Sequence, residues 1–291
     1  MSTAISWTNE TWNPVVGCEH VSAGCDNCYA KALHDMRHRA FNAGKKVLPQ
    51  YGVPFETVQL KPERLKHPVS WQKPRRVFVN SVSDLFHKDV PEAFLDQCFA
   101  VMAFCGRHTF QILTKRPARM RKYIDGLADR GGSGRGFRRL VNAGAELGLG
   151  LEFQGIPLIQ WPIPNVWLGT SVEHQAAADK RIPDLLATDA AVRFLSCEPL
   201  LGPVDLMPLQ IQHYLPNRRI DWVIVGGESG SKRREMDLAW LAEIVGHCKA
   251  SGVAVFVKQD SAPKSEQRGR IPDSLWIREF PVPVSPTGET A

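Results

Sequence analysis

The chain has 291 residues, of which 43% are hydrophobic, and its formal net charge is +6. This length can bury a large core, either as one large α/β barrel or as two smaller domains. No apolar run is long enough to cross a membrane, and residues 1–11 lack the pattern of a signal peptide. We therefore expect a cytoplasmic protein without a membrane anchor, in a compartment that keeps its seven cysteines reduced.

The positive charge is concentrated in three segments of the chain, residues 61–76, 115–122 and 130–139. A solvated surface explains such segments, and so does a surface that contacts the phosphates of a nucleic acid or a nucleotide. Composition does not decide between these two interpretations.

The first predicted strand, Trp12 to Gly17, leads directly into a short stretch with three cysteines, Cys18, Cys25 and Cys28. Glycine and other turn-forming residues separate the cysteines, so the backbone can fold back and bring the three sulfurs together. Four interpretations of this cysteine loop are open: a disulfide, a zinc site completed by His20, no metal, and an iron–sulfur cluster with one open iron.

The remaining cysteines lie in apolar or strand-like surroundings that are typical of buried free thiols. They are Cys98, Cys105, Cys197 and Cys248. The loop holds an odd number of cysteines, and the other four cysteines lie in apolar surroundings. A disulfide is therefore the weakest of the four interpretations.

A helix is predicted after Tyr29, with Leu33, Met36 and Phe41 on its apolar side. From Arg76 onward, short apolar runs alternate with helical patterns, which is typical of a parallel β/α sheet of about six or seven strands. The predicted strands are Val77–Asn80, Thr109–Thr114, Val166–Thr170, Val192–Ser196, Trp222–Gly226 and Val253–Lys258.

Polar residues follow nearly every predicted strand, at its carboxyl end. Because carboxyl strand ends converge at one mouth of a β/α barrel, this pattern favours a full or partial barrel over an open sheet. Capping of the following helices explains some of these residues but not Glu198, Lys115 or Lys258. The glycine-rich run 226–230 is either an anion-binding turn or a plain tight turn.

We predict a single domain over residues 1–280 and a flexible tail at 281–291. The longest stretch without a predicted strand holds the glycine-rich run 131–136. We interpret about 128–163 as an insertion in one crossover between strands, with a flexible hinge.

With these motifs assembled, the chain resembles the phage-associated three-cysteine family of radical S-adenosylmethionine (SAM)-like proteins. The resemblance spans about residues 5–260 and excludes the glycine-rich insertion and the tail. It rests on seven ordered motifs: Trp12–Pro14 with Gly17–Cys18, Gly24–Ala30, Val79–His87, Leu113–Pro117, Gly169–Glu173 with Ser196–Leu200, Gly226–Gly230 and Val257–Gln259.

This resemblance implies a partial parallel (β/α) barrel of the radical SAM type, with a [4Fe–4S] cluster on Cys18, Cys25 and Cys28. SAM would bind the open iron, and its one-electron cleavage would give a 5′-deoxyadenosyl radical that abstracts hydrogen from the substrate. An electron donor such as flavodoxin or ferredoxin is implied as a partner. The basic segments and the phage association favour a nucleobase or nucleotide substrate, including modification of phage DNA.

Two sets of side chains are candidates for the site. Those expected to contact SAM are Tyr29, Asn80, Ser81, Thr114, Ser171 and Glu198. Glu228 and Lys258, on the last strands, are the candidates for substrate contact and catalysis. The alternative hypothesis is a non-catalytic nucleic-acid-binding module that is stabilised by zinc on Cys18, His20, Cys25 and Cys28.

Overall fold

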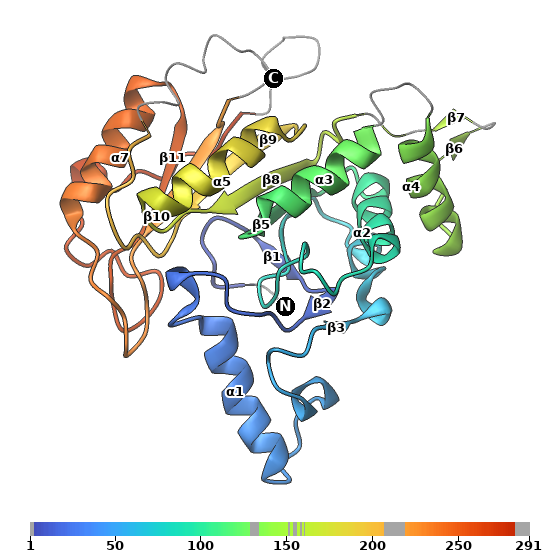
Figure 1. The fold of residues 1–291 in the computed structure, drawn as a ribbon, viewed down its shortest axis with the longest axis horizontal. Coiled ribbons are helices and arrows are strands. Elements are labelled where there is room, and N and C mark those ends of the chain that lie inside the picture. Colours follow the sequence, from blue (N-terminus) through green and yellow to red (C-terminus); the bar gives the residue numbers. More distant parts are fainter. Residues whose placement is uncertain are drawn as a thin grey trace.

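A curled sheet of seven parallel strands forms the centre of the protein, as the predicted alternation of strands and helices requires (Figure 1). The computed structural model describes residues 3–128, 134–150, 152–153, 156–157, 159, 161–206 and 219–282. The sheet order is β1-β4-β5-β8-β9-β10-β11, and the strands run in sequence order around a half-barrel. The fold is therefore α/β, with a partial parallel (β/α) barrel, as predicted.

The seven strands of the half-barrel are joined by helices. The strands are β1 (Glu10–Trp12), β4 (Arg76–Val79), β5 (Thr109–Thr114), β8 (Val166–Ser171), β9 (Val192–Cys197), β10 (Trp222–Gly226) and β11 (Ala254–Gln259). The helices are α1 (Tyr29–Asn42), α2 (Glu92–Phe104), α3 (Pro117–Ala128), α4 (Arg135–Glu146), α5 (Gln175–Ala187) and α7 (Leu238–Ala250). Short 3₁₀ helices occupy Ala23–Cys25, Pro49–Gly52, Pro62–Arg64, His67–Ser70 and Asp273–Leu275.

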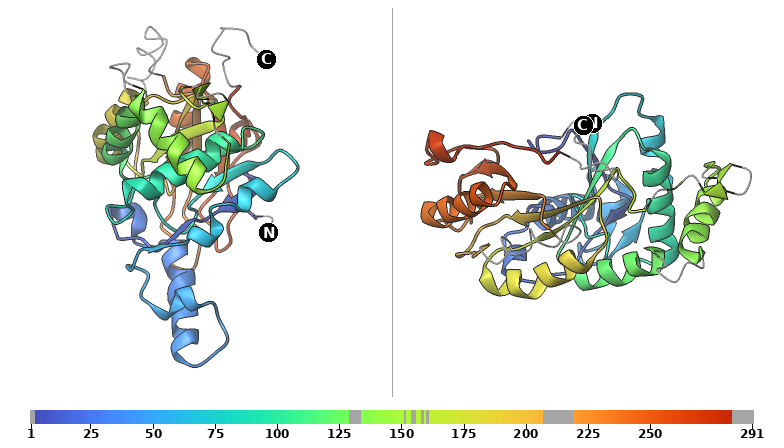
Figure 2. Two further views of the ribbon diagram at one scale, coloured as in Figure 1. Left: turned by 90° about the vertical axis from the view of Figure 1, so that its right-hand side faces the viewer. Right: turned by 90° about the horizontal axis from the view of Figure 1, so that it is seen from above.

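The two faces of the sheet are covered in different ways, because successive side chains of a strand point to opposite faces. On the convex face, residues such as Val77, Leu168 and Val223 pack against α2, α3, α5 and α7, which lie outside the strands (Figure 2). On the concave face, the alternate residues form a separate group that we call the inner aromatic cluster. Its members are Trp7, Phe78, Trp167, Val192, Phe194, Trp222, Ile224 and Phe256.

The segments near both ends of the described chain cover this inner aromatic cluster. Ile5 packs against it from residues before β1, and Phe280 from residues after β11. The Phe280 ring lies 5.4 Å from that of Trp222, and the Arg76 guanidinium lies 4.0 Å from the Phe280 ring centre. These two segments thus cover the concave face of the half-barrel, and no additional strands are needed.

The first strand differs from the prediction of Trp12 to Gly17. The sheet uses Glu10–Trp12, whereas Val15–Val16 (β2) pairs antiparallel with Gln59–Leu60 (β3) outside it. Pro14 interrupts the segment, because proline has no amide hydrogen for a strand ladder. The predicted bounds of this strand were wrong, although the strand leads into the cysteine loop as expected.

The predicted insertion lies between α3 and β8. It contains α4 and a two-residue antiparallel pair, β6 (Glu152–Phe153) and β7 (Ile156–Pro157), and α4 packs on α2 and α3. Residues 131–133 of the predicted hinge (131–136) and residues 283–291 of the predicted tail (281–291) lie outside the described residues, whereas Arg135 and Gly136 of the hinge already belong to α4. Among the helices of the described ranges, none has the length and apolar character needed to cross a membrane.

Candidate functional site

The cysteine loop lies across the carboxyl edge of the half-barrel. Consecutive tight turns shape it: the Cys25 amide donates to the Ser22 carbonyl (2.7 Å) and the Cys28 amide to the Cys25 carbonyl (3.2 Å). All three loop cysteines are free and half-buried, whereas the other four are free and fully buried, as predicted. The loop thiols are therefore the ones that a ligand can reach.

The Cys18 thiol lies in a partly buried, charged environment. Burial, and to a smaller extent the charges of Asp84 and Cys25, raise the pKa of Cys18 to about 11. Arg116 opposes this effect, since its guanidinium nitrogen lies 3.7 Å from the Cys18 sulfur.

Three arginines hold the cysteine loop on the sheet, and each is paired with a carboxylate that follows a strand. Arg116 pairs with Asp84 (2.8 Å), Arg181 with Glu173 (2.7 Å) and Arg234 with Glu228 (2.6 Å). Each arginine then donates to the loop, at Cys18 and Glu19, at Ser22, and at Ala23 and Asp26, respectively. The loop is thus fixed at its beginning and middle by ion pairs from different strands.

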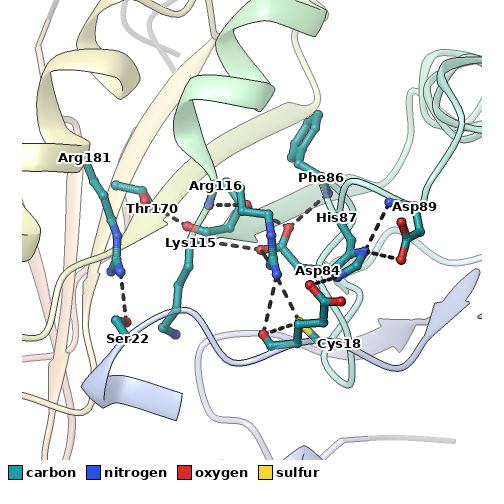
Figure 3. A network of polar contacts seen from close by, with 12 residues as sticks. Cys18, Ser22, Asp84, Phe86, His87, Asp89, Lys115, Arg116, Thr170 and Arg181 are labelled. Carbon is teal, nitrogen blue, oxygen red and sulfur yellow. Dashed lines mark hydrogen bonds and ion pairs between the residues drawn. The ribbon is translucent and has the colours of Figure 1, made fainter. Parts of the chain in front are cut away.

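Asp84 organises the first of these contacts (Figure 3). Its carboxylate accepts from the Thr114 hydroxyl (2.7 Å), the Phe86 amide (2.9 Å) and Arg116, and so joins the ends of β4 and β5. Thr114, a predicted SAM contact, lies on the convex side of β5, opposite to the concave residues, and its hydroxyl contacts Asp84. The structure therefore places Thr114 in the support of the loop, and its contact with SAM stays a prediction.

Glu228, a predicted catalytic residue, is fully engaged with the loop. It accepts from the Asn27 amide (2.9 Å), the Arg234 backbone amide (2.8 Å) and the Arg234 guanidinium. Burial raises the pKa of Glu228, but the bonds from Arg234 and Asn27 outweigh it and leave the pKa below its usual value. These contacts make Glu228 an anchor of the loop, and its catalytic role stays a prediction.

Asn80 and Ser81 continue from β4 next to the loop. Asn80 has a left-handed backbone (φ 59°) and is buried, and neither its amide nitrogen nor its amide oxygen has a hydrogen-bond partner. Buried polar atoms without partners are costly, so this amide is a natural ligand contact. Ser81 donates to Asn13 (3.2 Å), and its carbonyl accepts from the Tyr29 hydroxyl.

Tyr29 begins α1 immediately after Cys28, and 56% of its surface is exposed. Burial of the hydroxyl raises its pKa, and the charges of Cys28 and Glu198 raise it further. Tyr29, Cys28 and Glu198 are therefore electrostatic neighbours, although they come from opposite halves of the chain.

Glu198 and Lys258 form an ion pair of 2.6 Å between the ends of β9 and β11. Both side chains are partly accessible, at 18% and 12% exposed, and Lys258 lies two residues after Phe256 and so on the same, concave face of β11. Ser171 is also in the concave register of β8, and its carbonyl accepts from Arg181 (2.8 Å). The structure thus brings most of the predicted residues to one edge, with Lys258 and Asn80 on the concave side.

The three loop cysteines do not form a group as compact as the ligands of one metal ion. In the described part of the chain, Glu19, His87 and Asp89 are the one group of three ligand-type residues whose donor atoms lie within 4.8 Å of one another. Four ligands of one zinc ion lie closer than this, because each bond is about 2.0–2.3 Å long. His20 bonds Asp26 at 2.8 Å through its Nε2 atom.

The Glu19, His87 and Asp89 group is best described as an ion-pair cluster. Glu19 and Asp89 approach opposite nitrogens of the His87 ring, at 3.4 and 3.6 Å, and Lys88 also binds Glu19 at 3.0 Å. This arrangement fixes the position of Glu19 beside Cys18.

Arg181 and Arg234 were not identified from the sequence as part of the site. Arg181 lies inside α5 and Arg234 lies in a loop after β10, and neither belongs to a motif of the resemblance. Glu173 and Glu228 were recognised as strand-end residues, so a search for arginines that could reach them was the available signal.

Together these features define a class, a parallel α/β half-barrel that carries a three-cysteine loop clamped at its carboxyl edge. The chain belongs to the DUF5131 family, described as proteins of unknown function, whose model matches residues 2–277. No curated protein and no solved structure matches the chain.

Proposed function

We propose that the protein is a radical SAM enzyme that acts on a nucleobase or nucleotide. The observation that carries this proposal is the cysteine loop itself: three free, half-buried thiols clamped at the carboxyl edge of a parallel half-barrel. Active sites of parallel β/α barrels lie at this edge.

The residues of the loop fit a [4Fe–4S] cluster, because three free thiols without a fourth cysteine in the loop would leave one iron open. Cluster cysteines bind different iron atoms, so they lie farther apart than the ligands of one ion. Cys18, Cys25 and Cys28 would hold three irons and leave one for SAM. When bound, the cluster and SAM would supply a one-electron cleavage of SAM and a radical that abstracts hydrogen, with the electron from a flavodoxin or ferredoxin.

The orphaned amide of Asn80 would donate to and accept from polar groups of SAM, and its neighbours Ser81 and Tyr29 would also contact SAM in the proposal. The family resemblance extends the SAM contacts to Thr114, Ser171 and Glu198. The Tyr29 hydroxyl, whose pKa is raised, stays protonated at neutral pH and donates to the Ser81 carbonyl, so its exposed ring would make the contact with SAM.

Lys258 would face the substrate, since its ammonium group can bind a phosphate or a base carbonyl. Glu198 holds that ammonium in place through the 2.6 Å ion pair. Glu228 would support the site indirectly, because its hydrogen bonds fix the positions of Asn27 and Arg234. The bond between His20 Nε2 and Asp26 does not involve Nδ1, so it is compatible with the zinc-stabilised alternative and the metal content decides between the two.

The test is anaerobic reconstitution with iron and sulfide, followed by incubation with SAM and a reductant. We expect about four irons per chain and formation of 5′-deoxyadenosine. Cys25→Ala should lose both, whereas Cys98→Ala, a change at a fully buried cysteine, should keep both. His20→Ala should also keep the cluster. One zinc per chain without sulfide, released by His20→Ala, would support the alternative and contradict the proposal.

A further inference from the structure

Helix α1 and the segment after it project from the half-barrel as a finger, which we define as residues 29–58 (Figures 1 and 2). Whereas α2, α3, α5 and α7 cover the sheet, α1 packs on the 3₁₀ helix Pro49–Gly52. His34 bonds the Val53 carbonyl (2.9 Å) and His38 bonds the Tyr51 carbonyl (2.7 Å). These bonds make the finger a firm two-segment projection.

The finger is joined directly to the cysteine loop. Its helix starts one residue after Cys28, and the Cys18 amide donates to the Phe55 carbonyl (3.0 Å). Gly17 permits this approach, because a Cβ atom there would lie 2.4 Å from the Thr57 carbonyl oxygen and its φ is +93°. Whatever binds the finger is therefore held at a fixed position relative to the three cysteines.

The finger and the loop before it hold most of the exposed apolar side chains of the described residues. Seven large hydrophobic residues are exposed in the described part of the chain, and five of them lie in the finger or the loop before it: Val21, Tyr29, Met36, Phe41 and Leu48. Met36 is 53% exposed and Phe41 39% exposed, so two of the three residues on the apolar side predicted for this helix are exposed. Apolar side chains gathered on one exposed element mark an interaction surface.

The charges of the finger that have no ion-pair partner in the described residues are positive. Lys31 is neutralised by Asp35 (3.3 Å) and Glu56 (2.7 Å). Arg39, Lys45 and Lys46 are exposed, and within the described residues none of them forms an ion pair. The distal half of the finger thus combines exposed apolar side chains with three unneutralised cations.

We propose that the finger binds the backbone of a nucleic acid and positions one of its bases at the cysteine loop. This inference rests on the proposed function, because it makes the nucleobase substrate part of a polymer. Cations that contact phosphates and apolar side chains that wedge between base steps are the combination that bends and opens nucleic acids. An anionic membrane would match the charge but would present no base to the adjacent loop.

The spacing along the finger suits this role. Arg39 follows Cys28 by eleven residues, which is about 16 Å along a helix with a rise of 1.5 Å per residue. This length corresponds to about five steps of 3.4 Å along a nucleic-acid strand. The finger would therefore grip the backbone a few nucleotides away from the reacting base, where its cations do not disturb the cysteine loop.

The experiment compares two triple variants that lose the same charge. Arg39→Gln/Lys45→Gln/Lys46→Gln changes the finger, and Lys180→Gln/Lys249→Gln/Lys264→Gln changes exposed lysines of α5, α7 and the segment after β11, outside the three basic segments. Binding of a fluorescein-labelled duplex and of its single strand is followed by anisotropy at several salt concentrations. We expect the finger variant alone to bind at least tenfold more weakly, with a salt slope smaller by about 2.7, at 0.9 per phosphate contact.

A third variant, Met36→Ser/Leu48→Ser, should weaken binding while leaving the salt slope unchanged, because it removes apolar contacts and no charge. Equal binding by the two triple variants would overturn the proposal, as would the absence of nucleic-acid binding by the unmodified chain. So would finger-dependent binding to phosphatidylserine vesicles with nucleic-acid binding unaffected. Iron and sulfide are measured on the same preparations, so a missing cluster with finger-dependent binding contradicts the proposed function alone.

Discussion

The concave face and the carboxyl edge of the half-barrel are stabilised by opposite kinds of interaction. The inner aromatic cluster consists of rings that are almost free of polar contacts, and Trp222 alone faces five other rings at 5.4–6.2 Å. The carboxyl edge instead depends on three arginine–carboxylate pairs that fix the cysteine loop. The comparison indicates that the stability of the fold lies mainly in the aromatic cluster and the geometry of the site mainly in the ion pairs.

The largest effect on stability is expected from Trp222→Ala. Trp222 is completely buried, so its removal leaves a cavity and should lower the free energy of unfolding by about 3–5 kcal/mol. Urea denaturation measures this change. Val282→Ala, at a residue that is 61% exposed, is the control and should shift the midpoint by less than about 0.5 kcal/mol. A similar loss of unfolding free energy in both variants would contradict the view that the aromatic cluster supplies most of the stability.

A smaller loss, with a distinctive pH dependence, is expected from Glu173→Gln. Burial raises the pKa of Glu173, but Ser22 and Arg181 outweigh it and hold the pKa below the usual value of 4.5. The charged carboxylate therefore stabilises the fold above pH 4.5, and this stabilisation is lost as the pH falls through the lowered pKa.

Unfolding of wild type and Glu173→Gln should be compared at neutral and acidic pH. The variant should be less stable by about 2–3 kcal/mol near pH 7, because it leaves Arg181 buried without its counter-charge. The difference should shrink as the pH falls below 4.5. A gap that stays constant over this pH range would mean that the ion pair does not stabilise the edge.

Arg116→Gln should change the cluster more than the fold. Under the proposed function, a hydrogen bond from Arg116 to Cys18 stabilises the reduced cluster, because it offsets negative charge on the sulfur. Its loss should lower the midpoint potential by about 60 mV, a tenfold change for a one-electron couple. Redox titration followed by electron paramagnetic resonance measures the potential.

Arg119→Gln is the matched control for this change. It removes the same charge three residues farther along the chain, inside α3, but Arg119 donates to the Val90 carbonyl rather than to a cysteine. Iron content should be the same in both variants. Equal potentials with full iron content would show that the Arg116 contact does not tune the cluster.

The smallest stability effect is expected from Asn80→Gly. Glycine accepts the φ of 59° without strain, and the change removes an amide that has no partner, so stability should change by less than about 1 kcal/mol. SAM affinity of the reconstituted protein, measured by equilibrium dialysis, should fall about tenfold, as expected for one lost hydrogen bond. Unchanged affinity would remove Asn80 from the SAM site.

The sequence predicts the fold well where periodicity is strong. All six strands predicted after Arg76 exist, because each is a short apolar run bounded by turn residues. The first strand was misplaced, since the β-branched pair Val15–Val16 resembles a sheet strand while it pairs with β3 instead. Local composition does not distinguish a parallel sheet strand from a two-residue ladder.

The candidate site was predicted in its position but not in its internal connections. Strand-end polarity placed Asn80, Ser171, Glu198 and Lys258 at the carboxyl edge. The particular partners of Glu228 and Thr114 were not predicted, because Arg234 and Asp84 reach them through loops whose course depends on tertiary packing. Residue type identifies a polar edge, whereas only the folded chain determines which groups neutralise one another and which stay available.

The way in which the concave face is closed has a consequence for synthesis of the protein. Trp7 lies 6.2 Å from Trp222, and Phe280 adds the final ring, so contacts span almost the whole chain. A nascent chain on the ribosome cannot complete the packing around Trp222 until the segment with Phe280 has emerged. Such long-range closure slows folding, and until then the open aromatic surface is a target for chaperones and for aggregation.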